Sequence, residues 1–150
     1  MDIILNQKYE ISDLISYSGR FTATEFQKKI IEMVNNYKDI ALRSGEYMIT
    51  VTKSVEFVNG EQVMDVEILL PVNCRITATH PYRFKDKLRL TNALLVNVTK
   101  LSYLQETLEQ VDSYIMEHKL KPITSAYLVQ TKRDNLAVID IYVGINPNIL

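Results

Sequence analysis

Cysteine and histidine, which enzymes often use as nucleophile and base, are scarce in this 150-residue sequence. The sequence contains one cysteine, Cys74, and two histidines, His80 and His118. A nucleophilic enzyme needs a nucleophile, a base and a group that orients the base in one place, and only Cys74 and His80 are close in sequence. We expect His118 to be a partly buried packing residue at the end of a helical stripe. The sequence therefore predicts a protein that is not an enzyme, with a small hydrolase as the less favoured alternative.

Metal, cofactor and nucleic-acid chemistry also lack their usual sequence signals. Neither histidine has a His or Cys partner at metal-ligand spacing, so we expect no metal site. The four glycines form no glycine-rich loop before a helix, so we expect no nucleotide cofactor. With 17 basic and 18 acidic side chains, the net charge of −1 provides no field for nucleic acid or an anionic membrane.

Size and cysteine usage set the class of protein. A sequence of 150 residues that is 47% apolar can bury the core of one ordinary domain. One cysteine cannot form an internal disulfide, which fits a reducing compartment. No signal-peptide pattern opens the sequence, and no apolar run approaches the ~20 residues needed to span a bilayer. We therefore expect a single domain, residues 1–150, in the cytoplasm.

The most suggestive polar residues are two carboxylates at matching places in two strand-like segments. Glu67 lies in residues 64–72 and Asp140 in residues 137–145, each between apolar residues. Since side chains alternate between the two faces of a strand, each segment has one continuous apolar row, which we expect to lie under helices. These rows are Val66, Ile68, Leu70 and Val72 in the first segment and Ile139, Ile141, Val143 and Ile145 in the second.

The opposite faces of the two segments mix carboxylates with bulky apolar groups, which suits a ligand-binding groove. We predict that Glu67, Leu69, Asp140 and Tyr142, with Tyr127 nearby, border this groove. Two acids converging there would repel, which would raise the pKa of one of them and favour a cation between them. The alternative is that this face is solvated and its acids are solubility charges, because antiparallel sheets often expose one face.

The elements that would position these residues begin with an amphipathic helix over residues 21–43. Thr22 and Glu25 have the spacing of a capping box, and Gly45 is placed to end the helix in a left-handed conformation. One apolar stripe recurs at three- and four-residue spacing and should face a core. It consists of Phe26, Ile30, Met33, Val34, Tyr37, Ile40 and Ala41.

A second helix, over residues 102–120, repeats this pattern. Ser102 and Gln105 have capping-box spacing, and Pro122 prevents continuation of the helix. Its apolar stripe consists of Leu104, Leu108, Val111, Tyr114, Ile115 and His118.

Strand-like runs with β-branched residues fill most of the remaining sequence. The dipeptide Asn59-Gly60 favours a two-residue hairpin turn between two of them. The expected strands are residues 9–17, 47–52 and 63–72 in the first part and 88–99, 125–130 and 137–145 in the second.

The same order of elements thus occurs twice, which predicts an α+β fold made of two pseudo-symmetric βαββ units. The first unit covers residues 5–72 and the second covers residues 88–146, with a connection over residues 73–87. We expect one antiparallel sheet with both helices on one face. A duplicated unit of this kind forms a cradle that binds something between its halves.

Several segments in this order resemble the gyrase-inhibitor-like family, the effector-binding domains found at the ends of several bacterial transcription activators. The resemblance spans nearly the whole chain. It differs where the second opening strand meets its helix, since Thr99, Lys100 and Leu101 stand where the family usually has a glycine and an aromatic residue. The segments that carry it are residues 65–72, 95–98, 103–104, 115–120, 125–127 and 138–143.

This resemblance implies a stand-alone binding domain for a hydrophobic or cationic small ligand held in the cleft between the halves. Family members typically use a buried acid there, which by position would be Asp140 and then Glu67. The sequence contains no helix-turn-helix domain, so we do not expect a drug-sensing activator by itself.

The length and the order of elements also resemble a small bacterial family often encoded near type VII secretion clusters. That resemblance implies an alternative function, a protein–protein adaptor or chaperone for a partner such as a secreted toxin. The cradle would then hold a protein, and pairing with a second copy to form a homodimer is a further option.

Overall fold

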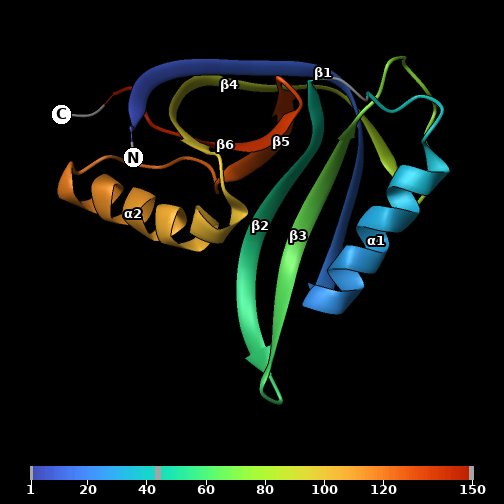
Figure 1. The fold of residues 1–150 in the computed structure, drawn as a ribbon, viewed down its shortest axis with the longest axis horizontal. Helices are drawn as coiled ribbons and strands as arrows, with labels where there is room; N and C mark the ends of the chain where they lie inside the picture. Colours follow the sequence, from blue (N-terminus) through green and yellow to red (C-terminus); the bar gives the residue numbers. More distant parts are fainter. Residues whose placement is uncertain (1, 43–44, 149–150) are drawn as a thin grey trace.

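The computed structural model of the chain describes residues 2–42 and 45–148, which form an α+β fold with six strands and two α-helices (Figure 1). A short 3-10 turn, Leu101–Tyr103, precedes the second helix. In chain order, the elements are β1 (Ile4–Thr22), α1 (Ala23–Asn36), β2 (Glu46–Val58), β3 (Glu61–Pro71), β4 (Arg83–Val98), α2 (Leu104–Glu117), β5 (Tyr127–Arg133) and β6 (Leu136–Gly144).

The chain contains two βαββ units, as the duplicated order predicts. The first is β1-α1-β2-β3 and the second is β4-α2-β5-β6. All strand pairs are antiparallel, and the strand order β1-β3-β2-β5-β6-β4 closes into a barrel. The halves join at two seams, β2 with β5 and β1 with β4, so an open cradle is replaced by a closed sheet.

Strand β1 makes the closure possible because it is long and sharply bent. Its 19 residues pair with β3 over residues 14–22 and with β4 over residues 4–16. Asn6 and Asp13 have positive φ angles of 59° and 62°, a conformation that Asn and Asp adopt more readily than most residues. Register shifts between Ile4 and Tyr9 bend the strand further. As a result, β1 and β4 curve together from one half to the other (Figure 1).

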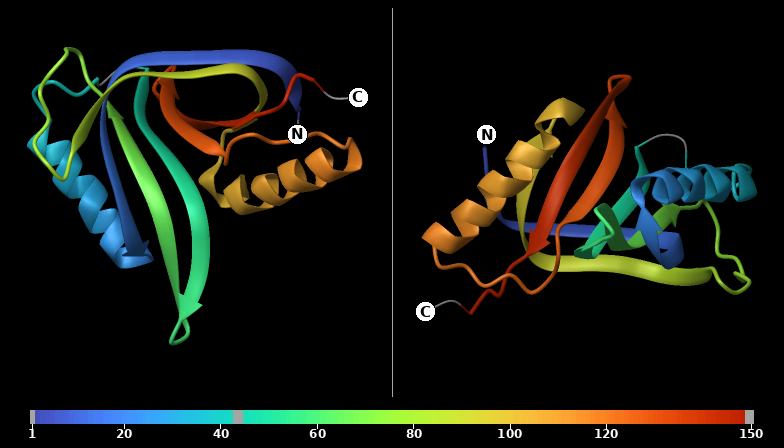
Figure 2. Two further views of the ribbon diagram at one scale, coloured as in Figure 1. Left: turned by 180° about the vertical axis from the view of Figure 1, so that it is seen from behind. Right: turned by 90° about the horizontal axis from the view of Figure 1, so that it is seen from below.

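Both helices lie on the same face of the sheet, as expected. Directly paired residues in a ladder point to the same side, and the register links Ile68 to Thr50, Thr50 to Leu128, and Leu128 to Ile141. Ile68 belongs to the core under α1 and Ile141 to the core under α2. We call this side the helix face, and Figure 2 shows strands of the sheet between the two helices.

Three apolar cores hold the fold together. One lies under α1, one lies under α2, and the third fills the interior of the barrel on the opposite side of the sheet. The buried members of the interior core are Tyr9, Leu14, Ile49, Leu69, Leu88, Leu90, Ala93, Val129 and Tyr142.

The first helix begins as predicted but ends early. Thr22 is the N-cap of α1, its Oγ1 accepts from the backbone N–H of Glu25, and the Glu25 side chain accepts from the Thr22 N–H at 2.9 Å. The helix stops at Asn36 rather than near residue 43. Gly45 does have a positive φ of 74°, but it lies just before β2 and does not end the helix.

The capping box predicted for the second helix is wrong. Ser102 lies in the 3-10 turn, Tyr103 occupies the N-cap, and no side chain caps the helix start. Gln105 instead donates to Glu109 at 3.4 Å, one turn further along the helix.

The predicted hairpin turn between β2 and β3 is confirmed. Asn59 and Gly60 both have positive φ angles, as a two-residue type I′ turn requires. Neither helix in the described part of the chain is long and apolar enough to cross a membrane.

Candidate functional site

The five residues predicted to border a groove all lie on the face opposite the helices. The ladder links Glu67 through Val51 to Tyr127, and Tyr127 to Tyr142, in one row across the sheet. The neighbouring row runs from Leu69 through Ile49 and Val129 to Asp140. The strand alternation therefore assigned both faces correctly.

The barrel closes over the middle of this face and fills it. Leu69 is fully buried, Tyr142 is 8% exposed, and the ring of Tyr9 stacks on that of Tyr142 with centroids 4.5 Å apart. Because β1 and β4 supply Tyr9, Leu88 and their neighbours to this interior, the open groove expected at Leu69 and Tyr142 is replaced by core. A binding role for the five residues stays a prediction.

Glu67 lies at one end of the interior and is held by cations and a hydroxyl. Ser16 Oγ donates to Oε2 at 2.7 Å, Lys85 Nζ lies 2.7 Å from the same oxygen, and Lys53 Nζ lies 3.9 Å from Oε1. Burial alone would raise the pKa of Glu67, but the hydrogen bonds from Lys85 and Ser16 and the lysine charges outweigh it and lower the pKa. The raised pKa expected from repulsion between two acids is therefore wrong for Glu67.

Asp140 has its own partners at the pseudo-equivalent position. Arg133 donates to both carboxylate oxygens, from Nη2 to Oδ2 at 2.5 Å and from Nη1 to Oδ1 at 3.3 Å. Asn97 Nδ2 also donates to Oδ1. Such a two-point pairing with Arg is among the stronger charged contacts in proteins. A cationic ligand at Asp140 would have to displace Arg133.

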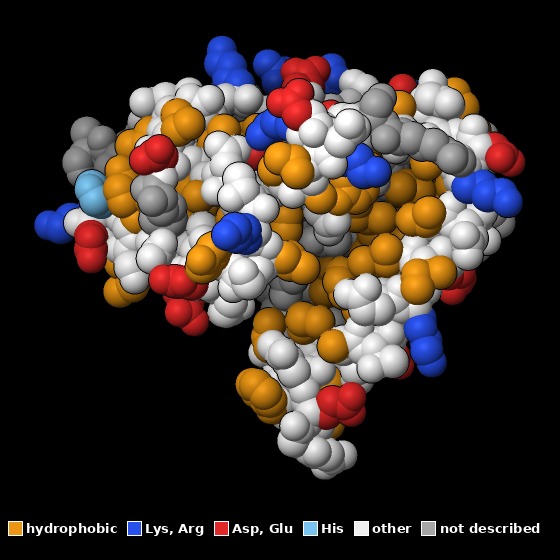
Figure 3. Space-filling view, viewed as in Figure 1, with side chains coloured by type: hydrophobic (Ala, Val, Ile, Leu, Met, Phe, Trp, Pro, Cys, Tyr) orange, Lys and Arg blue, Asp and Glu red, His pale blue; other side chains and the backbone are white. Residues whose placement is uncertain are grey.

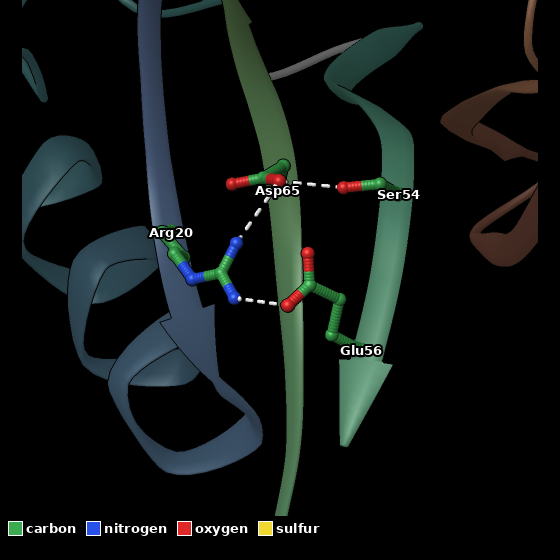
Figure 4. Close-up of polar contacts among 4 residues, drawn as sticks. All are labelled: Arg20, Ser54, Glu56 and Asp65. Atoms are coloured by element: carbon green, nitrogen blue, oxygen red, sulfur yellow. Dashed lines mark hydrogen bonds and ion pairs between the residues drawn. The ribbon is translucent and has the colours of Figure 1, made fainter. Parts of the chain in front are cut away.

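Asp65, two residues before Glu67 on β3, also has a basic partner, through a single contact (Figure 4). Arg20 bridges Asp65 at 3.4 Å and Glu56 at 2.8 Å, and Ser54 Oγ donates to Asp65 at 2.5 Å. These contacts tie β1, β2 and β3 together where the β2–β3 hairpin leaves the barrel (Figures 1 and 4). Asp65, Glu67 and Asp140 thus all have basic partners within the chain.

Among the described residues, one buried side-chain polar atom lacks a partner. The Tyr9 hydroxyl makes no hydrogen bond within the described part of the chain. Burial, followed by the neighbouring Glu46, Tyr142 and Asp140, raises the pKa of Tyr9 far above its ordinary value. Tyr9 therefore stays neutral at physiological pH.

The helix face carries a larger opening, a groove of about 640 Å³ between α2 and strands β2, β5 and β6. Its lining is mostly apolar, and Asp112 on α2 is the one acid among the described residues that line it. We call it the α2 groove, and apolar side chains gather on this face between the helices (Figure 3). The residues that define it are Thr52, Gln105, Leu108, Val111, Asp112, Ile115, Met116, Pro122, Thr124, Ser125, Ala126, Leu128 and Val143.

A second hollow on the helix face lies beside α1 and has a volume of about 500 Å³. Val34, Leu42, Tyr47 and Leu70 give it apolar walls, as in the α2 groove, but Lys38 and Lys132 also line it. The two hollows flank the β2–β5 seam, since Tyr47 and Thr52 lie on β2 and Leu128 and Lys132 lie on β5.

The spacing of three residues on α2 could have indicated the α2 groove from the sequence. Leu108, Asp112 and Met116 are spaced by four residues and therefore share one edge of α2, beside the buried stripe. Met116 is 79% exposed at this edge of the helix. Thr52 and Leu128, which also line the groove, could not be found in this way, because they come from strands of different halves.

Within the described part of the chain, no hydrogen bond joins the residues considered for catalysis. Cys74 and His80 are both exposed. His118 is exposed as well, and its ring stacks on Tyr114 with centroids 3.9 Å apart, so the expected partial burial is wrong.

Comparison with known proteins shows the fold. No protein-family model and no curated protein matches the sequence. Two similar solved structures are of EcmrR. A cryo-EM structure of the EcmrR–DNA complex in EcmrR-RPo matches with a TM-score of 0.66 and 17% identity, over 96% of this chain and 57% of that one. A crystal structure of the EcmrR C-terminal domain matches with a TM-score of 0.61 and 16% identity, over 97% of this chain and 99% of that one. The chain therefore spans little more than half of the EcmrR chain in the complex and has the fold of its C-terminal domain.

Proposed function

We propose that this chain is a non-catalytic binding domain of the gyrase-inhibitor-like kind that holds a hydrophobic small molecule in the α2 groove. The fold shared with the EcmrR C-terminal domain supports a domain of this kind. The groove itself is the observation that carries the proposal, because it is open and mostly apolar and lies between α2 and strands β2, β5 and β6. The exposed Cys74 thiol fits the reducing cytoplasm, where we place the protein.

The size and lining of the groove define the ligand. About 640 Å³ lies within the range of roughly 300–1,000 Å³ that is usual for small-molecule sites. Leu108, Met116, Leu128 and Val143 offer apolar contact on opposite walls, so most of the binding free energy comes from apolar area removed from water. A ligand with a flat or extended apolar body fits this lining.

Charge contributes less than apolar contact. Asp112 can attract a cationic group at the groove wall, but it is exposed, so the pair adds only about 0.2–1 kcal/mol. Glu67 and Asp140 cannot contribute here, because they lie on the other face with cations of their own. The groove should therefore bind neutral and cationic apolar ligands with similar affinity.

A ligand titration with matched variants tests this function. Leu108→Gln combined with Met116→Gln should weaken binding of a neutral apolar dye several-fold. Ile31→Gln, which removes an exposed apolar side chain from α1 outside the groove, should leave it unchanged. Asp112→Asn should weaken only cationic ligands. Equal loss of dye binding in the α1 control and the groove variant would remove the groove as the site.

A protein–protein adaptor or chaperone, for a partner such as a type VII secreted toxin, is the second candidate. The observation that favours it is the β2–β3 hairpin, which projects beyond the barrel and exposes Val55, Phe57 and Val58, with Phe57 76% exposed (Figure 1). Contiguous exposed apolar side chains mark contact surfaces. Purification from the native host with wild type and Phe57→Ser separates the two functions. A defined protein retained by wild type and lost with Phe57→Ser, together with no ligand in the groove, would establish the adaptor instead.

A further inference from the structure

We propose that the chain carries a second binding site, at the Glu67 end of the barrel, which takes the phosphate group of a small molecule. The site is a hollow of about 370 Å³ that we call the Glu67 basin. Its principal residues are Ser16, Ser18, Lys53, Glu67, Arg83 and Lys85. It lies on the face opposite the helices, so it is separate from the α2 groove and independent of the function proposed for that groove.

Four neighbouring strands bring these side chains together. Ser16 pairs with Arg83 across β1 and β4, and Ser18 pairs with Glu67 across β1 and β3. Lys53 reaches the basin from β2, where the register with β3 shifts between Thr52 and Ser54. A bulge of this kind adds one residue and re-aims a side chain, and it commonly does so beside functional sites. Most of the basin is thus formed by the sheet, and His80 and Pro81 of the β3–β4 connection also line it.

The charges in the basin do not balance. Lys53, Lys85 and Arg83 supply three positive charges and Glu67 supplies one negative charge, which leaves an excess of two. Glu67 pairs with Lys85 and, at 3.9 Å, with Lys53. The Arg83 side chain makes no hydrogen bond or ion pair with any described residue. The excess matches a phosphate monoester, which carries about −1.5 to −2 charge at pH 7, better than it matches a single carboxylate.

The buried acid organises the cations rather than cancelling them. The Glu67 side chain is 7% exposed, whereas those of Lys85 and Lys53 are 42% and 59% exposed. Glu67 therefore holds Lys85 in place while the ammonium group keeps donors free for a ligand. The Ser18 hydroxyl has no partner among the described residues and adds one more donor at the basin wall.

The pseudo-equivalent end of the barrel provides an internal comparison. There, Asp140 is met by Arg133 and by the neutral Asn97, so one cation faces one carboxylate and no excess remains. Glu67 and Asp140 occupy equivalent backbone positions, but only the Glu67 end has excess positive charge. We therefore expect anion binding at Glu67 and none at Asp140.

Titration of the folded chain with inorganic phosphate, followed by backbone NMR at constant ionic strength, tests the site. Phosphate should produce saturable shifts at Ser16, Ser18 and Lys53 and none around Asp140. Acetate should bind at least several-fold more weakly, because it brings one charge. Arg83→Gln and Lys53→Gln should each weaken phosphate binding about 3–10-fold, as expected for the loss of one charge-assisted contact.

Lys87→Gln is the matched control, because Lys87 lies on the same strand but pairs with Glu10 outside the basin. It should leave phosphate affinity unchanged. Met116→Gln, in the α2 groove, should also have no effect, so failure of the groove proposal would not affect this result. Glu67→Gln should have the opposite effect. It removes the negative charge of the basin and leaves an excess of three positive charges, so phosphate should bind more tightly. Non-saturating shifts, equal loss with Lys87→Gln, or acetate affinity equal to that of phosphate would overturn the proposal.

Discussion

The two faces of one sheet differ in what covers them. On the helix face, α1 and α2 have 14 residues each and cover one half each, so two mostly apolar hollows remain beside the β2–β5 seam between them. On the other face, β1 and β4 curve over the sheet, and the interior is filled by an apolar core. Each carboxylate of that face described above has a basic partner.

This difference shows that a face rich in acids and aromatic residues is not necessarily the open one. Glu67, Asp140 and Tyr142 look like a ligand site when each strand is considered alone. They become core and ion pairs once the sheet closes. The two larger hollows lie instead on the face whose covering elements are short, which is a property of helix length and placement.

The largest effect on stability should come from truncating a buried side chain on the filled face. Leu69 is fully buried in the interior core, so Leu69→Ala should lower the free energy of unfolding by ~2–5 kcal/mol. Leu108→Ala, on the half-buried wall of the α2 groove, should cost clearly less. Urea denaturation of the two variants measures both values, and equal losses would mean that the two faces are covered alike.

Breaking the ion pair between Arg133 and Asp140 should have the next largest effect on stability. Arg133→Gln removes a two-point partner from a buried carboxylate and should cost about 1–3 kcal/mol. Arg133 is half exposed, so the value should fall toward the lower end of this range. A double-mutant cycle with Asp140→Asn isolates the pair, and a coupling energy near zero would contradict the contact.

Acid should weaken the Glu67 contacts in a defined direction. The folded pKa of Glu67 is lowered below its unfolded value of about 4.3, so its contribution is fully present above that pH. The contribution is lost as pH falls through the folded pKa. Wild type should therefore lose more stability than Glu67→Gln when urea melts are moved from pH 7 to pH 3. Glu10, an exposed partner of Lys87, is the control, and Glu10→Gln should differ little from wild type. A larger acid loss in Glu67→Gln than in wild type would contradict this account.

The smallest effect should come from the unpaired hydroxyl of the interior. Tyr9→Phe removes a buried oxygen that has no partner among the described residues, so stability should stay within about 0.5 kcal/mol or rise. Tyr9→Ala should be strongly destabilising, because it also removes the ring that stacks on Tyr142. Thermal melts of both variants give the comparison, and a loss above 1 kcal/mol for Tyr9→Phe would reveal a bound water or ligand at the hydroxyl.

Local patterns predicted the local structure well. The capping box at Thr22 and Glu25, the Asn59-Gly60 turn and the two apolar strand rows are each set by residues close in sequence, and each is confirmed. The duplicated order also gave the βαββ units and the shared helix face. Helix ends were less predictable, since α1 stops at Asn36 although apolar spacing continues to Ala41.

Closure of the sheet could not be predicted, because it depends on non-local pairing. The bend of β1 at Asp13 and its change of partner from β3 to β4 join residues that no short window contains. That closure decides which face is open. The ion pairs of Glu67 and Asp140 follow from it, since Lys85 and Asn97 reach them from β4.

Backbone NMR mapping of a bound apolar ligand tests the central claim most directly. Saturating a uniformly labelled sample with a neutral hydrophobic dye should shift the amides of Thr52, Asp112 and Leu128 and leave those of Leu69 and Tyr142 in place. That result would place the ligand in the α2 groove, on the helix face. Shifts centred on Leu69, Asp140 and Tyr142, with α2 unaffected, would contradict the account and put the ligand inside the barrel.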